Sequence, residues 1–582
     1  MSRKLLALIL SLLMVFSIAL AEPASEVPEV HTIEEKSFPL YLERSETVFN
    51  EAFPLFFLDG VGDLPYVRLS DIVALFNGMF QLQGLEISLF TLEYDPEENA
   101  EVITNSANGS QAVFGYSDHT VFYPSFDTFA NAPGENPIDI VGSRGFNPNT
   151  GLPELFGRIN NPLMSRAGNP VFISLEDYGI RFVQQDGQRL VPLHTAFDLL
   201  VGMPLNGCNI WFNGQAIFVG SGEMLGDPDV VLTEYGKMYF SVAKQTRSPE
   251  LCRYGLGELC MELDNFYGLK NSHQIHSFVG MLLNTDFMPA LLSENPAMAD
   301  LALATILYGY MDDGHSAYNA NSWMTGPDPL ELAGGLSMIR RRHIQEKYEK
   351  AAEPYQEILR KPYYEVGNTA YVFFPEFYID PDIDYYKDLE KADLTKDTVA
   401  LVIYAHQQIF RENSPIENVV IDLTFNPGGI MDAGAFMLGW CLGVAPYSVH
   451  NTLNDALVTS LYRADVNLDR QFDEKDTLDG KNVYCLISPL SFSCANLVAW
   501  MFKTSGDVTL IGDTSGGGSC TVLPMTTAWG TSFQLSGCWR MSYVKNGSFY
   551  DVDQGVNPDV VITRCETLFD REKMTKIING LN

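Results

Sequence analysis

The chain has few basic residues for its length. It carries 37 Lys and Arg against 73 Asp and Glu, which gives a formal net charge of −36 at pH 7. Proteins that bind nucleic acid need basic patches to neutralise phosphates. We therefore exclude nucleic acid as an expected partner, and the charge says nothing further about the fold.

Long apolar runs are equally scarce. The one clear run, Leu5 to Leu20, follows Arg3 and Lys4 and leads into Ala19-Leu20-Ala21. A basic start, a short apolar run and a small-x-small cleavage site are typical of a secretory signal peptide. We expect residues 1–21 to be removed after Ala21 and the protein to be secreted, free or held at the cell surface. An uncleaved N-terminal anchor is the alternative, and no later run is long enough to span a bilayer.

Cysteine is also sparse, with nine residues and no CxxC or Cys/His grouping. This argues against a zinc site and against a disulfide scaffold. Cys252 and Cys260 are close enough in sequence for a disulfide around one loop in an oxidising exterior. The remaining cysteines are expected to be small buried hydrophobes.

What is present divides the chain into three parts after the signal peptide. Residues 22–245 are rich in short apolar runs and turn signals, which predicts a β-rich accessory region. Two segments in it, Leu64–Phe76 and Leu190–Leu200, each read as a strand entering a helix, and Asn209–Val219 reads as a hairpin. They are similar to the repeat of bacterial surface stalk domains, with an unrelated β-rich region as the alternative. Residues 246–365 show helical spacing and predict a helical subdomain.

Residues 366–582 alternate strand and helix patterns. We expect strands at 370–374, 419–423, 483–487 and 508–512, and helices at 394–410, 432–441 and 492–503. Such alternation predicts an α/β sheet with helices on its faces.

Ser493 lies where the third of these strands meets a helix, in Ser491-Phe492-Ser493-Cys494-Ala495-Asn496. Open α/β sheets bind ligands at this edge, and a helix N-terminus offers N–H groups to a developing oxyanion. The plainer alternative is that Ser493 only caps the helix. Three more segments change the weight of that alternative: Asn426-Pro427-Gly428-Gly429 and the glycine-rich loop 512–519, which each follow a strand, and 554–561 near the C-terminus.

In this order, the four segments resemble the tail-specific (C-terminal-processing) serine protease superfamily, which includes the tricorn core and interphotoreceptor retinoid-binding protein. The resemblance covers about 312–561. It implies a ClpP/crotonase-like α/β core, peptide or protein substrates and no cofactor for catalysis. It also implies that Ser493 is the nucleophile and that the N–H of Cys494, with that of Gly428 or Gly429, forms the oxyanion hole.

The family uses either a Lys in the glycine-rich loop or a His in an Asp-x-His motif as the base. The loop 512–521 has no Lys, whereas Asp313-Gly314-His315 supplies the second pattern. We therefore expect His315 to be the base, with a capping or surface histidine as the alternative. Asp551 and Asp553 are the candidates for orienting it; we prefer Asp553, the alternative being that both decorate an exposed turn.

Three departures from the family pattern bear on activity. Thr424 stands where the family usually has Arg, and Asn496 stands where it usually has Glu. The chain between His315 and Ala370 is too short for a PDZ domain, so we expect a branch without one.

A separate acidic segment at 465–476 has the spacing of an EF-hand or dockerin calcium loop. Arg470 stands where such loops favour Gly, and an acidic solvated loop is the alternative. We expect a structural Ca²⁺ ion held by Asp465, Asn467, Asp469, the Gln471 carbonyl, Asp473 and Asp476.

These features predict a secreted serine peptidase that works through a Ser–His acyl-enzyme. Two alternatives remain open: a catalytically inactive extracellular protein that binds a ligand or peptide on the same fold, and a wall- or glycan-binding N-terminal half that carries the hydrolase.

Overall fold

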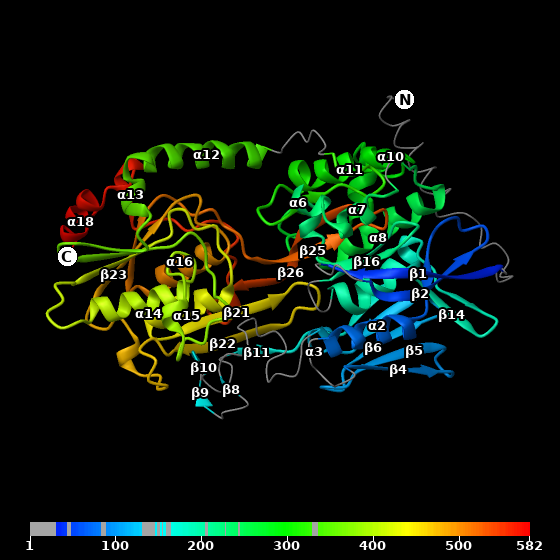
Figure 1. Ribbon diagram of the computed structural model, residues 1–582, viewed down its shortest axis with the longest axis horizontal. Coiled ribbons are helices and arrows are strands. Elements are labelled where there is room, and N and C mark those ends of the chain that lie inside the picture. The colour runs from blue at the N-terminus through cyan, green and yellow to red at the C-terminus, as the bar shows by residue number, and fades with distance from the viewer. Residues whose placement is uncertain are drawn as a thin grey trace.

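The computed structural model describes residues 31–43, 48–82, 89–130, 146–147, 152–153, 155–158, 164–203, 208–226, 228–242, 245–328 and 336–581 (Figure 1). The predicted signal peptide, residues 1–21, lies outside these ranges. Within them, no helix combines the length and the apolar character that a membrane crossing requires.

The predicted α/β part contains a six-stranded central sheet. Its strands run in the order β18 (Tyr363–Val366), β19 (Thr369–Phe373), β20 (Asn418–Asp422), β23 (Asn482–Ile487), β24 (Val508–Gly512) and β29 (Val560–Val561). All neighbours are parallel except β18 and β19. The four strands predicted here are confirmed, because buried parallel strands read as short apolar runs.

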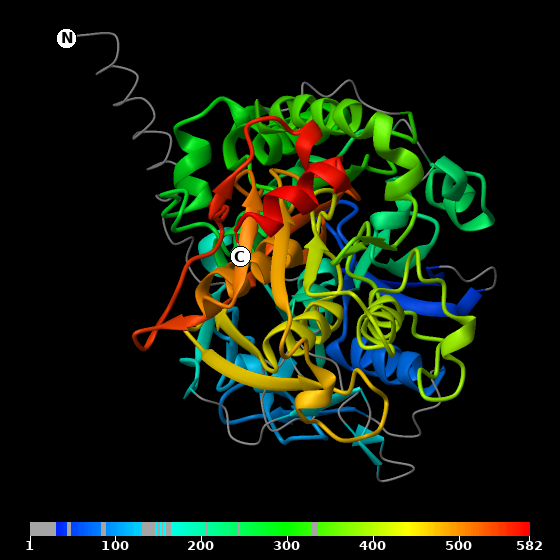
Figure 2. The same ribbon diagram turned by 90° about the vertical axis from the view of Figure 1, so that its left-hand side faces the viewer.

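Helices cover both faces of this sheet. Val419 and Cys485 belong to the large core with helices α14 (Thr398–Ile409), α15 (Met431–Leu442) and α16 (Cys494–Ser505). Val420 and Tyr484, one position along each strand, face a second core formed with α12 (Leu336–Ala352), α17 (Glu566–Phe569) and α18 (Arg571–Asn579). This alternation is the two-residue period of a strand, and it confirms the predicted layering. In Figure 2, where the left-hand side of Figure 1 faces the viewer, α18 (red) lies in front of the strands.

A second, antiparallel sheet was not predicted. Its order is β10 (Phe156–Arg158), β22 (Leu457–Ala464), β21 (Ala445–Asn451), β26 (Ser532–Ser542) and β17 (Ala317–Ala320), with β11 (Met164–Arg166) on β22 and β25 (Cys520–Thr526) on β26. It therefore takes strands from all three predicted parts of the chain. In Figure 1, β26 runs from the end of the molecule that holds α16 toward the end that holds α8.

The N-terminal part is β-rich, as predicted. One sheet has the order β13 (Val183–Gln185), β14 (Gln188–Pro192), β3 (Tyr66–Val67), β2 (Val48–Leu58), β1 (Ile33–Leu42), β16 (Ile217–Gly220), β15 (Asn209–Phe212). Another is a meander of β12 (Val171–Ser174), β7 (Thr120–Tyr123), β6 (Gln111–Gly115), β5 (Ala100–Asn105) and β4 (Phe90–Asp95). Two small pairs are β8 (Phe146–Asn147) with β9 (Leu152–Pro153) and, near the C-terminus, β27 (Val544–Lys545) with β28 (Ser548–Phe549).

The two look-alike segments adopt the predicted strand-to-helix form. The first is β3 entering α2 (Leu69–Leu82), and the second is β14 entering α4 (Leu193–Phe197), which continues as a π-helical turn over Asp198–Gly202. Their strands pair with each other, with Val191 opposite Val67. The predicted hairpin is β15 with β16. A short helix α3 (Phe126–Ala130) follows β7.

The predicted helical part contains α8 (Pro249–Phe266), α9 (Phe278–Leu283), α10 (Phe287–Leu291), α11 (Pro296–Thr305) and a π-helical turn, Ile306–Met311; α6 (Pro228–Val231) and α7 (Glu234–Tyr239) precede it. Near the end of this part, α12 is separated from α13 (Gln356–Leu359) by a 3₁₀ turn that contains Pro354.

The disulfide prediction is wrong. Cys252 and Cys260 both lie on α8, and all nine cysteines are free. Eight residues of helix separate the two by about 12 Å at ~1.5 Å per residue, whereas a disulfide needs Cα atoms within about 7 Å.

Candidate active site

Ser493 lies at the junction of β23 and α16, in a backbone conformation that L-residues rarely adopt. Its φ is 54° and its ψ is −121°, and its side chain makes no capping hydrogen bond to α16. The Ser493 N–H donates to the Gly517 carbonyl at 2.8 Å, which fixes the turn. Strain of this kind collects at functional sites, and a strained strand-to-helix turn exposes a nucleophile. The helix-cap alternative does not describe this serine.

Gly428 and Gly429 approach Ser493 from the end of β20. Their φ values are 113° and 127°, and a Cβ on Gly428 would lie 2.7 Å from the Ser493 Cβ and 3.0 Å from the Cys494 nitrogen. The Gly428 N–H donates to the Asn426 side chain at 2.9 Å. The turn therefore needs glycine, and the Gly428 N–H is already engaged.

Replacing Gly428 by alanine is expected to lower activity by roughly 10²–10³-fold, the loss typical of a damaged oxyanion site. The new Cβ would press on Ser493 and Cys494 at a φ that alanine avoids. The rate of serine labelling by a fluorophosphonate measures this. Gly480→Ala is a control for strain alone, since Gly480 has positive φ but no atoms within 4 Å of an added Cβ. Equal losses in both variants would contradict a specific role for the 428 turn.

The glycine-rich loop wraps the same turn from the other side. Gly516 N–H donates to the Ser491 carbonyl at 2.8 Å, and Phe492 pairs with Gly517 in an isolated parallel bridge. A Cβ on Gly518 would lie 2.7 Å from the Phe492 ring and 3.0 Å from His315 Cε1. Glycine at these positions lets the loop close over Phe492 and His315 together.

His315 is brought next to the residue that precedes Ser493. Its ring packs on Phe492 with centroids 4.7 Å apart. The segment is fixed by Asp313, whose Oδ1 accepts the His315 N–H at 3.0 Å and the Ser316 N–H at 2.7 Å. The ring is buried, and its Nε2 has no hydrogen-bond partner. An imidazole nitrogen without a partner is available to accept a proton.

Burial lowers the pKa of His315 to about 4, with Asp313 opposing the shift and Arg341 adding to it. Because the neutral ring is the form that accepts a proton, serine labelling should hold constant at neutral pH and fall only as pH drops through about 4. A fluorophosphonate labelling rate measured against pH, with circular dichroism to confirm folding at each point, checks this. A midpoint at 6.5 or above would contradict it.

Asp553 lies beside the site but does not contact His315. Its Oδ1 accepts the Ser519 N–H and hydroxyl, each at 3.1 Å, and its carbonyl accepts the Gly518 N–H at 3.0 Å. Asp551 pairs with Arg540 instead. The acid that acts electrostatically on His315 is Asp313. Asp313 is the Asp of the Asp-x-His motif, so the sequence motif already contained this acid.

The two unusual motif residues have structural partners. Asn496 donates to the Val552 carbonyl at 2.8 Å and accepts from Ser515 at 2.7 Å, which ties α16 to the glycine-rich loop. Thr424 donates to Asp422 at 2.6 Å, and the guanidinium at this position comes from Arg571 on α18. Both side chains therefore hold the strand ends around Ser493.

Two contributors were missed by sequence reasoning. The Phe492 ring contacts both His315 and Arg341, and the Arg341 guanidinium is 4.5 Å from the ring centroid. Arg341 also donates to the Gly314 carbonyl at 3.3 Å. Burial lowers the pKa of Arg341. No local pattern marks Arg341, because α12 reaches the site only through the tertiary fold.

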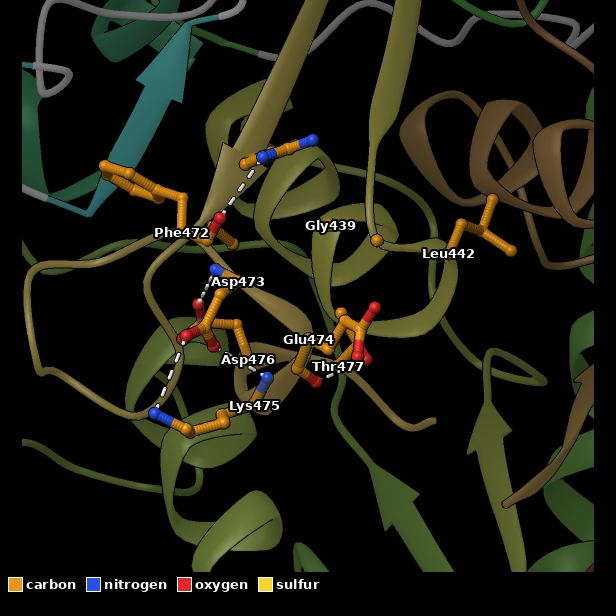
Figure 3. A pocket seen from close by; sticks show the side chains of 11 residues that line it. Gly439, Leu442, Phe472, Asp473, Glu474, Lys475, Asp476 and Thr477 are labelled. Atoms are coloured by element: carbon orange, nitrogen blue, oxygen red, sulfur yellow. Dashed lines mark hydrogen bonds and ion pairs between the residues drawn. The ribbon is translucent and has the colours of Figure 1, made fainter. Parts of the chain in front are cut away.

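The predicted calcium loop is folded around its own carboxylates. Asp465 accepts the N–H groups of Asp469 and Arg470 at 3.1 and 2.8 Å, and Asp476 accepts those of Val466 and Asn467 at 2.8 and 3.1 Å. Figure 3 shows the second half of the loop beside a cavity of about 630 Å³. The other three side chains also accept backbone N–H groups of the loop. Asn467 accepts that of Asp469, Asp469 accepts that of Gln471, and Asp473 accepts that of Lys475.

The loop carboxylates do not converge as metal ligands. Among the described residues, the one group of three or more His, Cys, Asp or Glu with ligand atoms within 4.8 Å of one another lies elsewhere, at His194, Asp198 and Glu258. Calcium at 465–476 therefore stays a prediction from spacing.

Comparison with known proteins agrees with the resemblance. Residues 388–562 match the model of peptidase family S41. This match defines a serine peptidase, an enzyme of the hydrolase class. The matched part of the chain is thus similar to peptidase family S41, which agrees with the resemblance to tail-specific proteases. Peptidases of this family generally need no cofactor and act on proteins.

Solved structures with similarity include the photosystem II D1 C-terminal processing protease, with 16% identity and a TM-score of 0.25 over 35% of this chain and 47% of that one. A candidate peptidase from Parabacteroides merdae has 16% identity and a TM-score of 0.40 over 57% and 96%. The tricorn protease has 10% identity and a TM-score of 0.25 over 84% and 58%. The chain thus spans about half the length of the first and nearly all of the second. Curated proteins gave no match.

Proposed function

We propose that this chain is a secreted peptidase that cleaves peptide bonds through an acyl-enzyme on Ser493, with His315 as general base. The observation that carries the proposal is Ser493 itself. Its side chain is not used to cap α16, and its strained backbone places it against the Gly428 turn and the α16 N-terminus. A serine whose only task was structural would not need this conformation.

The reaction follows from the neighbours of Ser493. The hydroxyl attacks the substrate carbonyl while His315 Nε2, which has no competing partner, accepts its proton. The oxyanion is held by the N–H of Cys494, the first residue of α16, and by that of Gly429, because the Gly428 N–H is engaged by Asn426. His315 then returns the proton to the departing amine, and water releases the acyl group by the reverse sequence.

Two acids take different parts in this scheme. Asp313 holds the His315 backbone and favours the protonated ring that forms during attack. Asp553, our preferred acid from sequence, acts through the glycine-rich loop by holding Ser519 and Gly518 beside the ring. Asp553→Asn should therefore slow labelling less than Asp313→Asn does.

The test is covalent labelling of the purified mature chain with a fluorophosphonate probe, mapped by mass spectrometry. Modification of Ser493 that is absent in Ser493→Ala and strongly slowed in His315→Ala supports the proposal. A folded wild-type chain that is not labelled at any serine would overturn it. The ligand-binding alternative would then be pursued with peptide and hydrophobic probes.

Secretion and calcium are further parts of the proposal. The basic start and short apolar run support export with cleavage after Ala21, which N-terminal sequencing of exported protein tests. The spacing at 465–476 supports a structural Ca²⁺ ion. Addition of millimolar Ca²⁺ should then raise the melting temperature, and Asp465→Asn should remove that rise. An unchanged melting temperature would leave 465–476 as an acidic loop.

A further inference from the structure

A buried group of titratable side chains lies between the N-terminal sheet and α8, and the proposed reaction does not use it. His194 and Asp198 are four residues apart where α4 passes into its π-helical turn. Glu258 and Glu262 are four residues apart on α8. Residues at this spacing share one helix face, so two pairs of ligand-type side chains face each other across the interface.

All four side chains are withdrawn from solvent, with relative exposures of 2% for His194, 1% for Asp198, 1% for Glu258 and 0% for Glu262. Ligand atoms of His194, Asp198 and Glu258 lie within 4.8 Å of one another. Glu262 interacts electrostatically with both Asp198 and Glu258. The cluster therefore has the size of a single-ion site.

Most polar atoms of the cluster have no hydrogen-bond donor in the described structure. His194 Nδ1, both oxygens of Asp198, both oxygens of Glu262 and Oε2 of Glu258 are buried without a hydrogen bond from a donor group. The Asp198 and Glu262 carboxyl groups face each other closely enough to share a proton. Leaving such atoms unpaired costs free energy, and buried carboxylates are normally paired or coordinate a metal. No Lys or Arg acts on these four residues in the described structure.

One carboxylate is oriented as a metal ligand often is. Glu258 Oε1 accepts the hydroxyl of Tyr254 at 2.6 Å and that of Thr195 at 3.3 Å, which leaves Oε2 for the cluster. Tyr254 in turn contacts Thr195 at 2.9 Å. Outer partners that fix one oxygen and leave the other free are the usual support of a metal site.

Charge also favours a cation. Burial raises the pKa of Asp198 to about 7 and that of Glu258 and Glu262 well above the ordinary value, and it lowers the pKa of His194 to about 3. Three carboxyl groups and one imidazole are thus buried together, and a divalent ion would satisfy their unpaired atoms together.

We propose that His194, Asp198, Glu258 and Glu262 bind a divalent transition-metal ion. Imidazole with carboxylates is a donor set that Zn²⁺ and its neighbours accept, whereas Ca²⁺ and Mg²⁺ take oxygen ligands. The ion joins the turn after α4 to α8. The residue that follows α8, Tyr267, donates to Asp313 at 2.9 Å, so the ion also braces the segment that carries His315.

The experiment uses the purified mature chain. Metal content is measured by mass spectrometry before and after chelation, and the chelated protein is titrated with Co²⁺ and followed by absorption and by melting temperature. We expect one ion per chain, a lower melting temperature after chelation that Zn²⁺ restores, and a Co²⁺ spectrum without thiolate bands. Excess Ca²⁺ should not displace the ion, which separates this site from the 465–476 loop.

Isosteric variants assign the ligands. Asp198→Asn, Glu262→Gln and His194→Asn should each lose the Co²⁺ spectrum and the Zn²⁺-dependent rise in melting temperature. His406→Asn is the control, because His406 is also a buried histidine with a lowered pKa but its Nδ1 accepts from Trp440 at 3.2 Å. That variant should keep the Co²⁺ spectrum.

Three results would overturn the proposal. The first is a wild-type chain that binds no ion and melts at the same temperature with and without chelator. The second is a bound ion that all three variants retain, which would place it elsewhere. The third is a higher melting temperature in Asp198→Asn and Glu262→Gln with no response to Zn²⁺, as expected if the carboxyls share protons. If a variant does not fold, the metal content and melting temperature of the wild-type chain still decide whether the protein binds an ion.

Discussion

Replacing Ser493 by alanine should abolish hydrolysis of an unfolded protein substrate, with a loss of at least about 10⁴-fold in kcat, as for other serine nucleophiles. The loss should appear in kcat rather than KM, because the hydroxyl forms a bond only in the reaction itself. Release of fluorescence from labelled casein, at substrate concentrations on both sides of KM, separates the two parameters. His315→Ala should have an effect of similar size, since the two residues act as a unit.

Ser505→Ala is a suitable control, because Ser505 ends the same helix and its hydroxyl bonds only locally, to the Phe502 carbonyl and the Asp507 N–H. It should leave kcat unchanged. Full activity in Ser493→Ala would move the reaction to another residue. A wild-type chain that is labelled at Ser493 but cleaves no protein would restrict the activity to small esters or peptides.

Replacing Arg571 by methionine should destabilise the folded chain by about 3–5 kcal/mol, the usual effect of breaking a buried ion pair. Arg571 and Asp422 are 2% and 0% exposed, and they join α18 to the end of β20. The variant leaves the Asp422 carboxylate buried with only the Thr424 N–H and hydroxyl as partners. The midpoint of urea unfolding, followed by tryptophan fluorescence, measures the change.

The double variant Asp422→Asn with Arg571→Met should recover most of that loss, because it removes both charges together. Lys503, which pairs with Asp559 at a partly exposed position on α16, is the surface comparison. Lys503→Met should cost less than about 1 kcal/mol. A similar cost for the two single variants would show that the Arg571 pair is solvated in solution.

The central sheet could be predicted because its inner strands are mostly apolar. β20 and β23 are short apolar runs bounded by turns, and each is followed by a helix with its own spacing. The second sheet could not be predicted in this way. β26 reads Ser-Phe-Gln-Leu-Ser-Gly-Cys-Trp-Arg-Met-Ser, and almost every position is buried, polar ones included. Its polar and apolar residues largely alternate, which is typical of a strand with one exposed face, so this pattern does not indicate a strand that is covered on both faces.

The site was partly predictable for a related reason. Ser493, His315 and the two glycines lie in local motifs, and the structure places all four residues around one turn. Asp553 and Arg341 show the limit of such motifs. Whether a carboxylate reaches His315 or Ser519 depends on the packing of the glycine-rich loop, and the reach of Arg341 depends on the position of α12.

The pairing of β10 with β22 bears on the order in which this protein is made. Phe156 lies opposite Ala464, so a strand from the first third of the chain pairs with a strand from the last third. During synthesis the N-terminal segment emerges with an edge that has no partner until β22 follows. The same contact means that the N-terminal half cannot be removed cleanly, since β22 would keep an open edge. A shortened protein is therefore expected to self-associate, which would hide any activity of the remaining sheet.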